Sequence, residues 1–342
     1  MQKKTINIKE LALKLDLSVT TVSRVLNGKA KQYRIKEETE KKVCEAAKRL
    51  HYSPNQFARG LKLDKSETIG VIAPDISNPF FADIIKNIEK ECRQKGYSVL
   101  IGDSDENPLF EEQMVERFES RKVDGLIIAP VGLSFSHLIE TYNRGLPMVV
   151  VDRSQQGLII PSVTSNNYKG AYEAVELLIS YGHKKIACIQ GLANSQSNND
   201  RVNGYIDAMK KYGFSSNELL ISGTGFTVEN GYESTLLFLK TDIKPTAILA
   251  LNNRISLGVL QAVAEMGVSI PDNLSLISFD EQVYSAYLNT PMTTIEQDKP
   301  EIARLAVQYL FSQIDDEPAV DEQNNEEIPT KINMRKSIKR LL

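Results

Sequence analysis

Two successive series of short apolar segments, each followed by an amphipathic stretch, occupy the chain from Thr68 onward. The apolar segments are TIGVIA, YSVLI, DGLIIA and PMVVV in the first series and KIACIQ, ELLIS, TAILAL and LSLISF in the second. Each apolar segment has the length of a buried strand, and each intervening stretch has the length of a helix. This alternation predicts parallel strands covered by helices. Because the scheme restarts near Ser165, we expect two similar α/β lobes.

The first fifty residues carry a different pattern, which predicts three short helices. Asn7 and Glu10 have the spacing of a capping box at the start of the first helix. Ser18 precedes a second helix over residues 19–26, and a third helical pattern runs over residues 37–50. Three short helices with a tight first turn describe a helix-turn-helix. The pattern alone leaves open an ordinary three-helix module that binds protein.

The second predicted helix has small hydrogen-bonding side chains on its polar side, as a helix that enters the major groove requires. Arg24 can form a bidentate pair with guanine, Thr20 can bond to several bases, and Val19 can contact a thymine methyl group. Polar neighbours suit phosphate contacts. The predicted DNA contacts are the base-reading Val19, Thr20 and Arg24, together with Asn7, Ser18, Thr21, Ser23, Asn27 and Lys29.

Charge is distributed unevenly along the chain. Residues 1–65 contain 16 Lys and Arg against 7 Asp and Glu, whereas the whole chain has a net charge of −3. A basic N-terminal part agrees with phosphate contacts. The N-terminus lacks an apolar core followed by a cleavage site, and no stretch of about 18 apolar residues occurs. We therefore expect a soluble, cytoplasmic protein without membrane contact.

The sequence carries no pattern typical of a metal site or an enzyme. Its three cysteines and three histidines are far apart, which excludes a local metal-ligand cluster. Residues 103–107, DSDEN, begin like a calcium loop, but Pro108 stands where that loop needs glycine. A P-loop, a nucleophile elbow and a glycine-rich dinucleotide loop are all missing. We expect no catalytic residues, no metal and no cofactor.

Several longer segments resemble the lactose-repressor (LacI/GalR) family of bacterial regulators. In the N-terminal part these segments are IKELALKLDLSVTTVSRVLNG and ETEKKVCEAAKRLHYSPNQFARGLK, followed by TIGVIAPDISNPFF. Further landmarks are DGLIIAP, VVVDR, GHKKIACIQG, DRVNGY, PTAILALNNRISLGVLQAV, IPDNLSLISFDE and MTTIEQD. Two features depart from the family pattern. The loop GKAKQYR is longer, and Lys36 stands at a helix-cap position where serine is frequent.

The resemblance implies an α/β protein with an all-α N-terminal domain. Residues 1–52 would form the helix-turn-helix domain, 53–67 a hinge helix and linker, and 68–342 an effector-binding and dimerisation domain that resembles periplasmic binding proteins. The chain would cross between lobes near Ser165, Pro291 and Pro329. The first lobe would then comprise about 68–164 and 292–326, and the second about 165–291 and 327–342.

The hinge segment begins with Ser53-Pro54, which has the chemistry of a helix start. The predicted helix is about eight residues long and cannot hold its structure alone in water. In the family this helix folds on the operator and wedges an apolar side chain into the minor groove, a position that Leu61 matches. Asn55, Arg59 and Leu61 are the predicted DNA contacts of this segment. A plain flexible linker is the alternative.

The loops after the predicted strands should line the effector site, because ligands of open parallel sheets bind beyond the carboxyl ends of the strands. These loops contain charged and amide groups that can fix hydroxyl groups, and aromatic rings that can cover an apolar face. By resemblance, the ligand is contacted by Phe80 or Phe81 and by Arg201, Asn252 and Asp280, and Phe226 matches a stacking position of some members. Each of these residues could instead have a purely structural role. The predicted effector contacts are Asp75, Asn78, Phe80, Phe81, Arg153, Arg201, Phe226, Asn252 and Asp280.

The leading hypothesis is a transcriptional regulator, expected to be a repressor, whose affinity for double-stranded operator DNA is controlled by a small-molecule effector. The expected effector is a carbohydrate or a sugar derivative bound between the lobes. The expected assembly is a homodimer, because the sequence shows no leucine-heptad tail that would pair two dimers. A solute-binding protein without DNA function is the alternative, against which the basic N-terminal module argues. An enzyme would need a reactive constellation that the sequence lacks.

Overall fold

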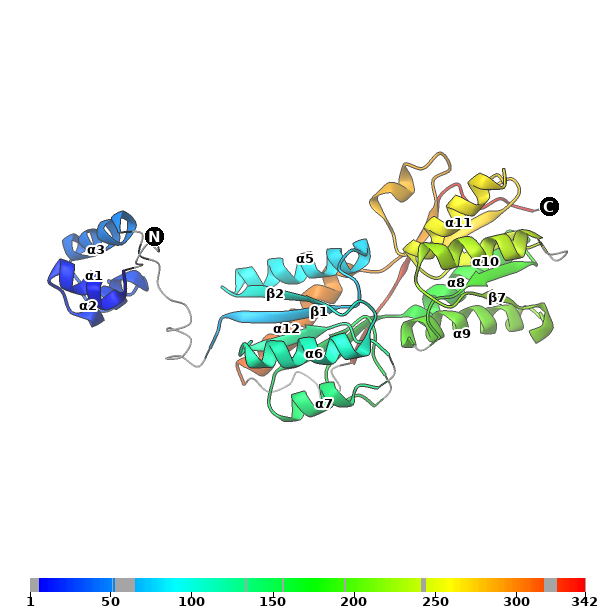
Figure 1. Cartoon of the computed structure of the whole chain (residues 1–342). Coiled ribbons are helices and arrows are strands. Elements are labelled where there is room, and N and C mark those ends of the chain that lie inside the picture. The colour runs from blue at the N-terminus through cyan, green and yellow to red at the C-terminus, as the bar shows by residue number, and fades with distance from the viewer. Residues whose placement is uncertain are drawn as a thin grey trace. The chain divides into compact units, whose positions relative to one another are not determined.

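The computed structural model describes residues 6–50, 52, 65–132, 134–155, 157–193, 195–240, 244–316 and 325–341. The chain forms two compact units, Met1–Ser66 and Glu67–Leu342 (Figure 1). The predicted hinge helix, with its proposed DNA contacts Asn55, Arg59 and Leu61, lies outside the described residues.

The first unit contains three described helices, α1 (Ile8–Leu15), α2 (Val19–Leu26) and α3 (Glu37–Arg49). The predicted capping box is present at α1: Asn7 Oδ1 accepts from the amide of Glu10 at 2.9 Å, and Glu10 Oε2 accepts from the amide of Asn7 at 3.2 Å. Ser18 caps α2 by accepting from the amide of Thr21 at 3.0 Å. Lys36 precedes α3 without a side-chain cap bond.

The apolar positions of these helices meet in one small core. Ala30, from the long loop between α2 and α3, joins this core and thereby anchors the loop. Val22 and Val25 bury one side of α2 and leave its polar side at the surface. The arrangement confirms the predicted helix-turn-helix. The buried residues of the core are Leu11, Ala12, Leu15, Val22, Val25, Ala30, Val43, Ala46 and Ala47.

The first lobe of the second unit is a parallel sheet between two pairs of helices. Its strands are β1 (Thr68–Ala73), β2 (Ser98–Asp103), β3 (Gly125–Ile128), β4 (Met148–Val151), β5 (Ser162–Ser165) and β11 (Asn325–Ile328). The order is β11-β5-β4-β3-β1-β2, with parallel pairing throughout. Core residues place one helix pair on each face (Figure 1). The pairs are α5 (Pro79–Gln94) with α12 (Lys299–Ile314), and α6 (Pro108–Ser120) with α7 (Ser136–Asn143).

The second lobe repeats this plan. Its strands are β6 (Ile186–Ile189), β7 (Leu220–Ser222), β8 (Ala247–Ala250), β9 (Ser275–Phe279), β10 (Thr293–Glu296) and β12 (Lys331–Asn333), in the order β12-β10-β9-β8-β6-β7. Pairing is parallel except between β10 and β12. The two faces are covered by α8 (Asn167–Ser180) with α9 (Gln196–Lys211), and by α10 (Val228–Lys240) with α11 (Asn253–Glu265). The short helices η1 (Ser216–Glu218) and η2 (Val283–Ala286) lie in connections.

The chain passes between the lobes at three places. The first follows β5, and the third lies between β11 and β12. The second lies later than the predicted crossing near Pro291. Thr293, Thr294 and Ile295 pair with β9 and complete the second sheet, and the chain then enters α12, which packs against α5 in the first lobe. Segment 293–296 therefore belongs to the second lobe.

Helices α10 and α11 approach so closely that their contact requires glycine. A β-carbon at Gly258 would collide with the carbonyl oxygen of Val228 and lie 2.5 Å from the amide nitrogen of Tyr232. We expect Gly258→Ala to lower the free energy of unfolding by about 1–3 kcal/mol, because the two backbones must move apart. Gly225→Ala is the control, since the nearest atom to its β-carbon would be 3.8 Å away. Urea denaturation followed by circular dichroism measures both; equal stability of the two variants would contradict the expectation.

Candidate functional site

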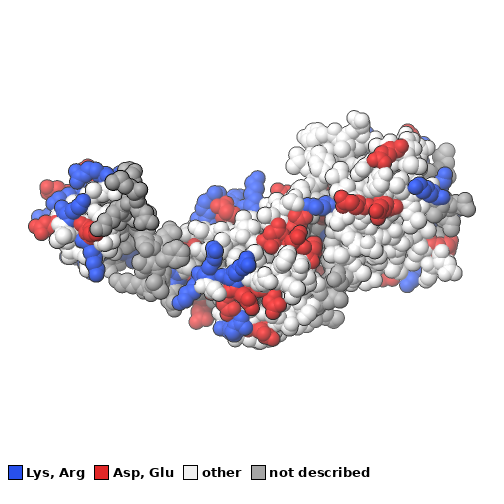
Figure 2. Space-filling model, in the orientation of Figure 1, with Lys and Arg blue, Asp and Glu red and all other residues white. Residues whose placement is uncertain are grey.

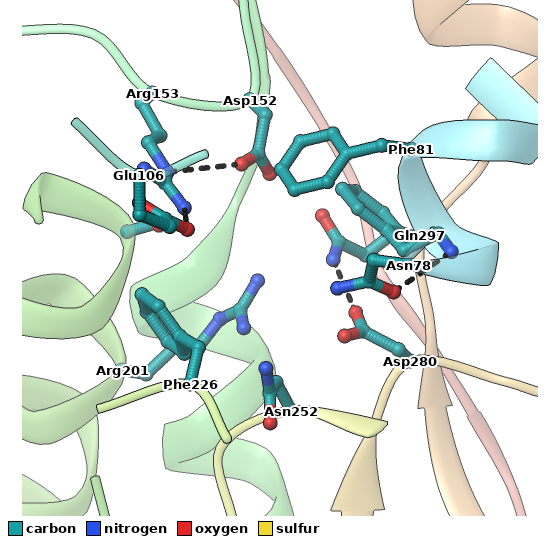
Figure 3. A pocket seen from close by; sticks show the side chains of 12 residues that line it. Asn78, Phe81, Glu106, Asp152, Arg153, Arg201, Phe226, Asn252, Asp280 and Gln297 are labelled. Carbon is teal, nitrogen blue, oxygen red and sulfur yellow. Dashed lines mark hydrogen bonds and ion pairs between the residues drawn. The ribbon is translucent and has the colours of Figure 1, made fainter. Parts of the chain in front are cut away.

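A pocket lies between the two lobes of the second unit, at the carboxyl ends of the strands (Figure 3). The first lobe contributes the start of α5, which follows β1, and the turns after β2 and β4. The second contributes the N-terminal part of α9 and the turns after β7, β8, β9 and β10. The hollow, with its opening to solvent, has a volume of about 320 Å³. Its lining residues are Asn78, Phe80, Phe81, Glu106, Asp152, Arg153, Ser197, Arg201, Phe226, Asn252, Asp280 and Gln297.

The structure brings all the predicted effector contacts except Asp75 together at this pocket. Asp75 instead forms an ion pair with Arg254 of α11, with Oδ2 and Nη2 2.6 Å apart. Its other carboxylate oxygen accepts from the amide of Ser77 at 2.8 Å. Asp75 thus bridges the lobes beside the pocket. Sequence reasoning missed Glu106, Asp152, Ser197 and Gln297, of which Asp152 directly follows a predicted strand and could have been found by the same rule.

Two buried carboxylates face the pocket from corresponding positions of the two lobes. Asp152 directly follows β4 and Asp280 directly follows β9, and both have left-handed backbone angles, with φ of 63° and 69°. Asp280 accepts from Gln297 Nε2 at 2.6 Å and from the amide of Asn253 at 3.3 Å. Burial raises the pKa of Asp152 to about 6, against the opposing effect of Arg153 and Arg201. The pocket therefore offers carboxylate oxygens from both lobes.

Arg153 is buried and held by a bidentate ion pair (Figure 3). Its Nη1 donates to Glu106 Oε2 at 2.8 Å, and its Nη2 donates to Glu106 Oε1 at 2.6 Å. Arg153 Nε lies 3.7 Å from Asp152 Oδ2 and has no hydrogen-bond acceptor among the described residues. The guanidinium carbon lies 5.8 Å from the ring centroid of Phe81 and 5.5 Å from that of Phe226. Arg153 thus contacts aromatic rings from both lobes.

Arg201 reaches the pocket from α9 and is fixed by its own lobe. Its Nε donates to Asn167 Oδ1 at 2.8 Å and its Nη1 donates to the carbonyl oxygen of Leu251 at 2.6 Å. The guanidinium carbon lies 4.1 Å from the ring centroid of Phe279. Burial lowers the pKa of Arg201, although Asp280 and Asp152 act in the opposite direction. These contacts orient a cation at the pocket wall.

Asn252 and Phe226 show how a lining residue can also serve the fold. Asn252 caps α11, because its Oδ1 accepts from the amide of Ile255 at 2.8 Å. Asn252 therefore has the structural role of a helix cap and also lines the pocket. The ring of Phe226 lies against Gly191, where a β-carbon would collide with it. Glycine at this position leaves room for an aromatic side chain in the pocket wall.

On the helix-turn-helix unit, α2 leaves Val19, Thr20 and Arg24 exposed. Lys and Arg side chains lie across the visible face of this unit (Figure 2). Asn27 Nδ2 donates to the carbonyl oxygen of Ser23 at 2.7 Å, so these two residues support each other at the end of α2. Val19, Thr20 and Arg24 are therefore accessible at the surface of α2.

The long loop after α2 contributes an aromatic contact that the sequence pattern did not predict. The guanidinium carbon of Arg24 lies 3.8 Å from the ring centroid of Tyr33. Tyr33 belongs to the segment GKAKQYR, whose length departs from the family pattern. Stacking on an aromatic ring restricts the orientations of a guanidinium group.

Within the described ranges, no helix combines the length and the apolar character needed to span a bilayer. Among the same residues, no group of three or more His, Cys, Asp and Glu side chains could hold a metal ion. The three cysteines are free, with Cys92 and Cys188 buried.

A helix-turn-helix unit followed by a two-lobed α/β unit with a polar pocket defines the class of ligand-responsive DNA-binding regulators. Residues 7–55 match the bacterial regulatory proteins of the lacI family, and residues 66–334 match the periplasmic binding proteins and sugar binding domain of the LacI family. The chain belongs to the LacI family. The family resemblance seen in the sequence is thereby confirmed.

Similar proteins extend over nearly the whole chain. The HTH-type transcriptional repressor PurR of Histophilus somni (strain 129Pt) is 33% identical over 98% of this chain and 99% of its own. Catabolite control protein A of Priestia megaterium is 32% identical over 98% of this chain and 99% of its own. Both relatives are regulators by name.

Solved structures agree with the fold. The lac repressor dimer bound to operator and the anti-inducer ONPF has a TM-score of 0.87 and 26% identity, and the match covers 98% of this chain and 100% of that one. A LacI family transcriptional regulator from Enterococcus faecium with bound ribose has a TM-score of 0.72 and 27% identity, covering 80% of this chain and 100% of that one. The predicted fold class is confirmed.

Proposed function

We propose that this chain is a transcriptional repressor that binds operator DNA as a homodimer and whose DNA affinity is controlled by a sugar or sugar derivative bound between its lobes. The observation that carries the proposal is a pocket with charged, amide and aromatic side chains from both lobes, in a chain that also has a helix-turn-helix. The names of PurR and of the ribose-bound regulator support it.

The pocket chemistry suits a polyhydroxylated ligand. Carboxylate oxygens of Asp152 and Asp280 can accept hydrogen bonds from hydroxyl groups, and Arg201 can donate to them. The rings of Phe81 and Phe226 can cover the apolar face of a sugar ring. Because these groups come from both lobes, a bound ligand would stabilise one arrangement of the lobes over others.

For DNA binding we propose the division of labour that the sequence suggested. Arg24, Thr20 and Val19 read base edges, and the other polar residues of the helix-turn-helix hold phosphates. Residues 1–52 form the DNA-binding domain, 53–67 the hinge, and 68–342 the effector-binding domain. A solute-binding protein without DNA function would have no use for the lacI-type helix-turn-helix at residues 7–55.

We further propose that the pocket binds its ligand without transforming it. Asp280 is fixed by Gln297 and Asn253, and Glu106 is fixed by Arg153. Carboxylates held in this way are suited to orienting hydroxyl groups. The similar proteins named above are regulators, which supports the same view.

Contacts between the lobes connect the pocket to the arrangement of the lobes. Arg254 Nη2 donates to Ser77 Oγ at 2.6 Å and pairs with Asp75, and Asn253 Nδ2 donates to Asn78 Oδ1 at 2.8 Å. Asn78 itself lines the pocket. A ligand can shift DNA affinity only by its differential affinity for the lobe arrangements. These polar contacts beside the pocket are where such a difference would arise.

Selection of DNA ligands from a random duplex pool tests the DNA part of the proposal. The full-length protein should enrich a pseudo-palindromic sequence, because a two-fold dimer presents two identical recognition helices. Gel-shift titrations with a panel of sugars and nucleosides should then show that one compound changes the affinity for that sequence. Enrichment of an unrepeated half-site, or no enrichment, would contradict the proposal.

Two exposed apolar side chains in and directly after η2 support a homodimer. Val283 in η2 and Tyr287 directly after it are 87% and 84% exposed. Single exposed apolar residues are common, but neighbouring ones mark a surface that contacts another protein. We expect Tyr287→Asp to weaken dimerisation by about 4 kcal/mol, or ~1000-fold, because a two-fold interface contains the residue twice. Light scattering after size exclusion measures the assembly. Leu109→Asp on α6, where Leu109 is 65% exposed, is the control and should stay dimeric; a dimeric Tyr287→Asp would contradict the assignment.

A further inference from the structure

Glu106 occupies an unusual backbone turn that directs its side chain into the pocket. Asp105 and Glu106 are consecutive residues with left-handed angles, φ of 49° and 51°. The amide of Glu106 donates to the carbonyl oxygen of Pro74 at 2.9 Å, which ties the turn to the end of β1. Left-handed backbone is unfavourable for residues other than glycine and persists where the surroundings enforce it. The turn therefore holds a carboxylate at a defined place in the wall.

This carboxylate neutralises Arg153 and occupies both of its terminal nitrogens. Glu106 accepts from Nη1 at 2.8 Å and from Nη2 at 2.6 Å. This bidentate pair offsets the charge of Arg153 and uses one N–H of each terminal nitrogen, so the end of the guanidinium group is not open to a ligand phosphate or carboxylate. Arg201, the other cation in the wall, already donates from Nε and Nη1 to its own lobe.

The fixed charge of the wall is also unfavourable to anions. Among its lining residues are three carboxylates, those of Glu106, Asp152 and Asp280, and two guanidinium groups, those of Arg153 and Arg201. An anionic ligand would lose its hydration on entering and would gain no net attraction in return. An uncharged polyol loses less on leaving water, and its hydroxyl groups can donate to the carboxylates.

We propose that the pocket selects an uncharged polyhydroxylated ligand over its phosphorylated or carboxylated forms, and that Glu106 sets this selection by holding Arg153. The inference rests on the proposed function of the pocket as the effector site. Glu106 acts on the ligand through Arg153 and is in that sense a positioning residue.

Calorimetric titration of the full-length protein with matched ligand pairs tests the selection. The pairs are D-ribose with ribose 5-phosphate and D-glucose with glucose 6-phosphate, and inorganic phosphate serves as a separate probe. We expect the wild type to bind a neutral member at least tenfold more tightly than its phosphorylated partner, and to show no heat with inorganic phosphate. Tighter binding of a phosphorylated sugar than of its neutral parent would overturn the selection.

Glu106→Gln tests the role of Glu106, because glutamine keeps the shape and one hydrogen bond to Arg153 but removes the charge. The preference for the neutral member should fall at least tenfold in this variant, and inorganic phosphate should now bind. Glu112→Gln is the control, since Glu112 is exposed on α6, six residues further along the chain; it should behave as the wild type. An unchanged preference in Glu106→Gln would overturn its role.

The titrations distinguish a failure of the proposed sugar effector from a failure of the proposed selection against charged ligands. If no sugar of either pair binds the wild type, ribose and glucose are excluded as effectors, whereas the inorganic phosphate titrations still decide the inference on charge. Phosphate binding that appears in Glu106→Gln and disappears in Glu106→Gln/Arg153→Gln supports it. Phosphate binding by the wild type, or none by Glu106→Gln, overturns it. The wild-type titrations decide the selection even if a variant fails to fold.

Discussion

Arg201→Ala is expected to abolish the response to effector and to leave operator binding by the ligand-free protein intact. Arg201 offers a charged donor at the pocket wall, and a hydrogen bond to a charged group contributes about 1.5–3 kcal/mol. Loss of this bond should weaken effector binding by about tenfold to a hundredfold. The operator is bound by the other unit of the chain, so its affinity should not change. Gel-shift titration with and without effector measures both effects.

The variant also loses bonds to Asn167 and Leu251, so its folding must be checked. Asp280→Asn provides a second test, because it removes a pocket charge while keeping an acceptor for Gln297. Arg304→Ala on the surface of α12 is the control, since Arg304 pairs with Glu301 outside the pocket. A well-folded Arg201→Ala protein with a normal response, or with lost operator affinity, would count against the assignment.

Arg24→Ala is expected to weaken specific operator binding by about 1–3 kcal/mol in each half-site and to relax the sequence preference at one base pair. In a dimer the two losses add, so the dissociation constant should rise about 30-fold or more. Lys29→Ala is the matched comparison, because an exposed lysine that contacts phosphate affects all sequences alike. Fluorescence anisotropy with operator variants at one fixed salt concentration separates the two. Equal changes in sequence preference for both variants would show that the roles are wrongly assigned.

The fold was predictable because its signals are local and repeated. Strands such as β3 and β4 are apolar on both faces, since helices cover both sides of each sheet, and the sequence therefore shows them as continuous apolar runs. The crossing near Pro291 was placed too early because Thr293–Glu296 has few large apolar residues, although it completes the second sheet. Its place depends on pairing with β9, which is not a local signal.

The pocket was predictable to the extent that it follows from strand ends. Asp280 directly follows β9, and Arg153 and Asn252 are the second residues after β4 and β8, so topology alone places them at one edge. Glu106 was missed because its direction depends on two successive left-handed residues, which no pattern in DSDEN indicates. Asp75 follows the same rule as the others but is engaged by Arg254, a partner distant in sequence.

The stacking of Arg24 on Tyr33 was also not predicted, because it depends on how the loop folds back onto α2. The loop that carries Tyr33 is visible in the sequence as an extension, but the point at which it returns to α2 is set by the burial of Ala30. The helices and strands could therefore be predicted from the sequence, whereas the contacts between them could not.

The central claim is that effector and operator sites are coupled through the chain, and a closed thermodynamic cycle tests it most directly. Operator affinity is measured by anisotropy with and without saturating effector, and effector affinity by calorimetry with and without saturating operator. Linkage requires that the two ratios be equal, and coupling of the usual size predicts that each differs from one by about 5- to 150-fold. A protein that binds both ligands with both ratios equal to one would contradict the account.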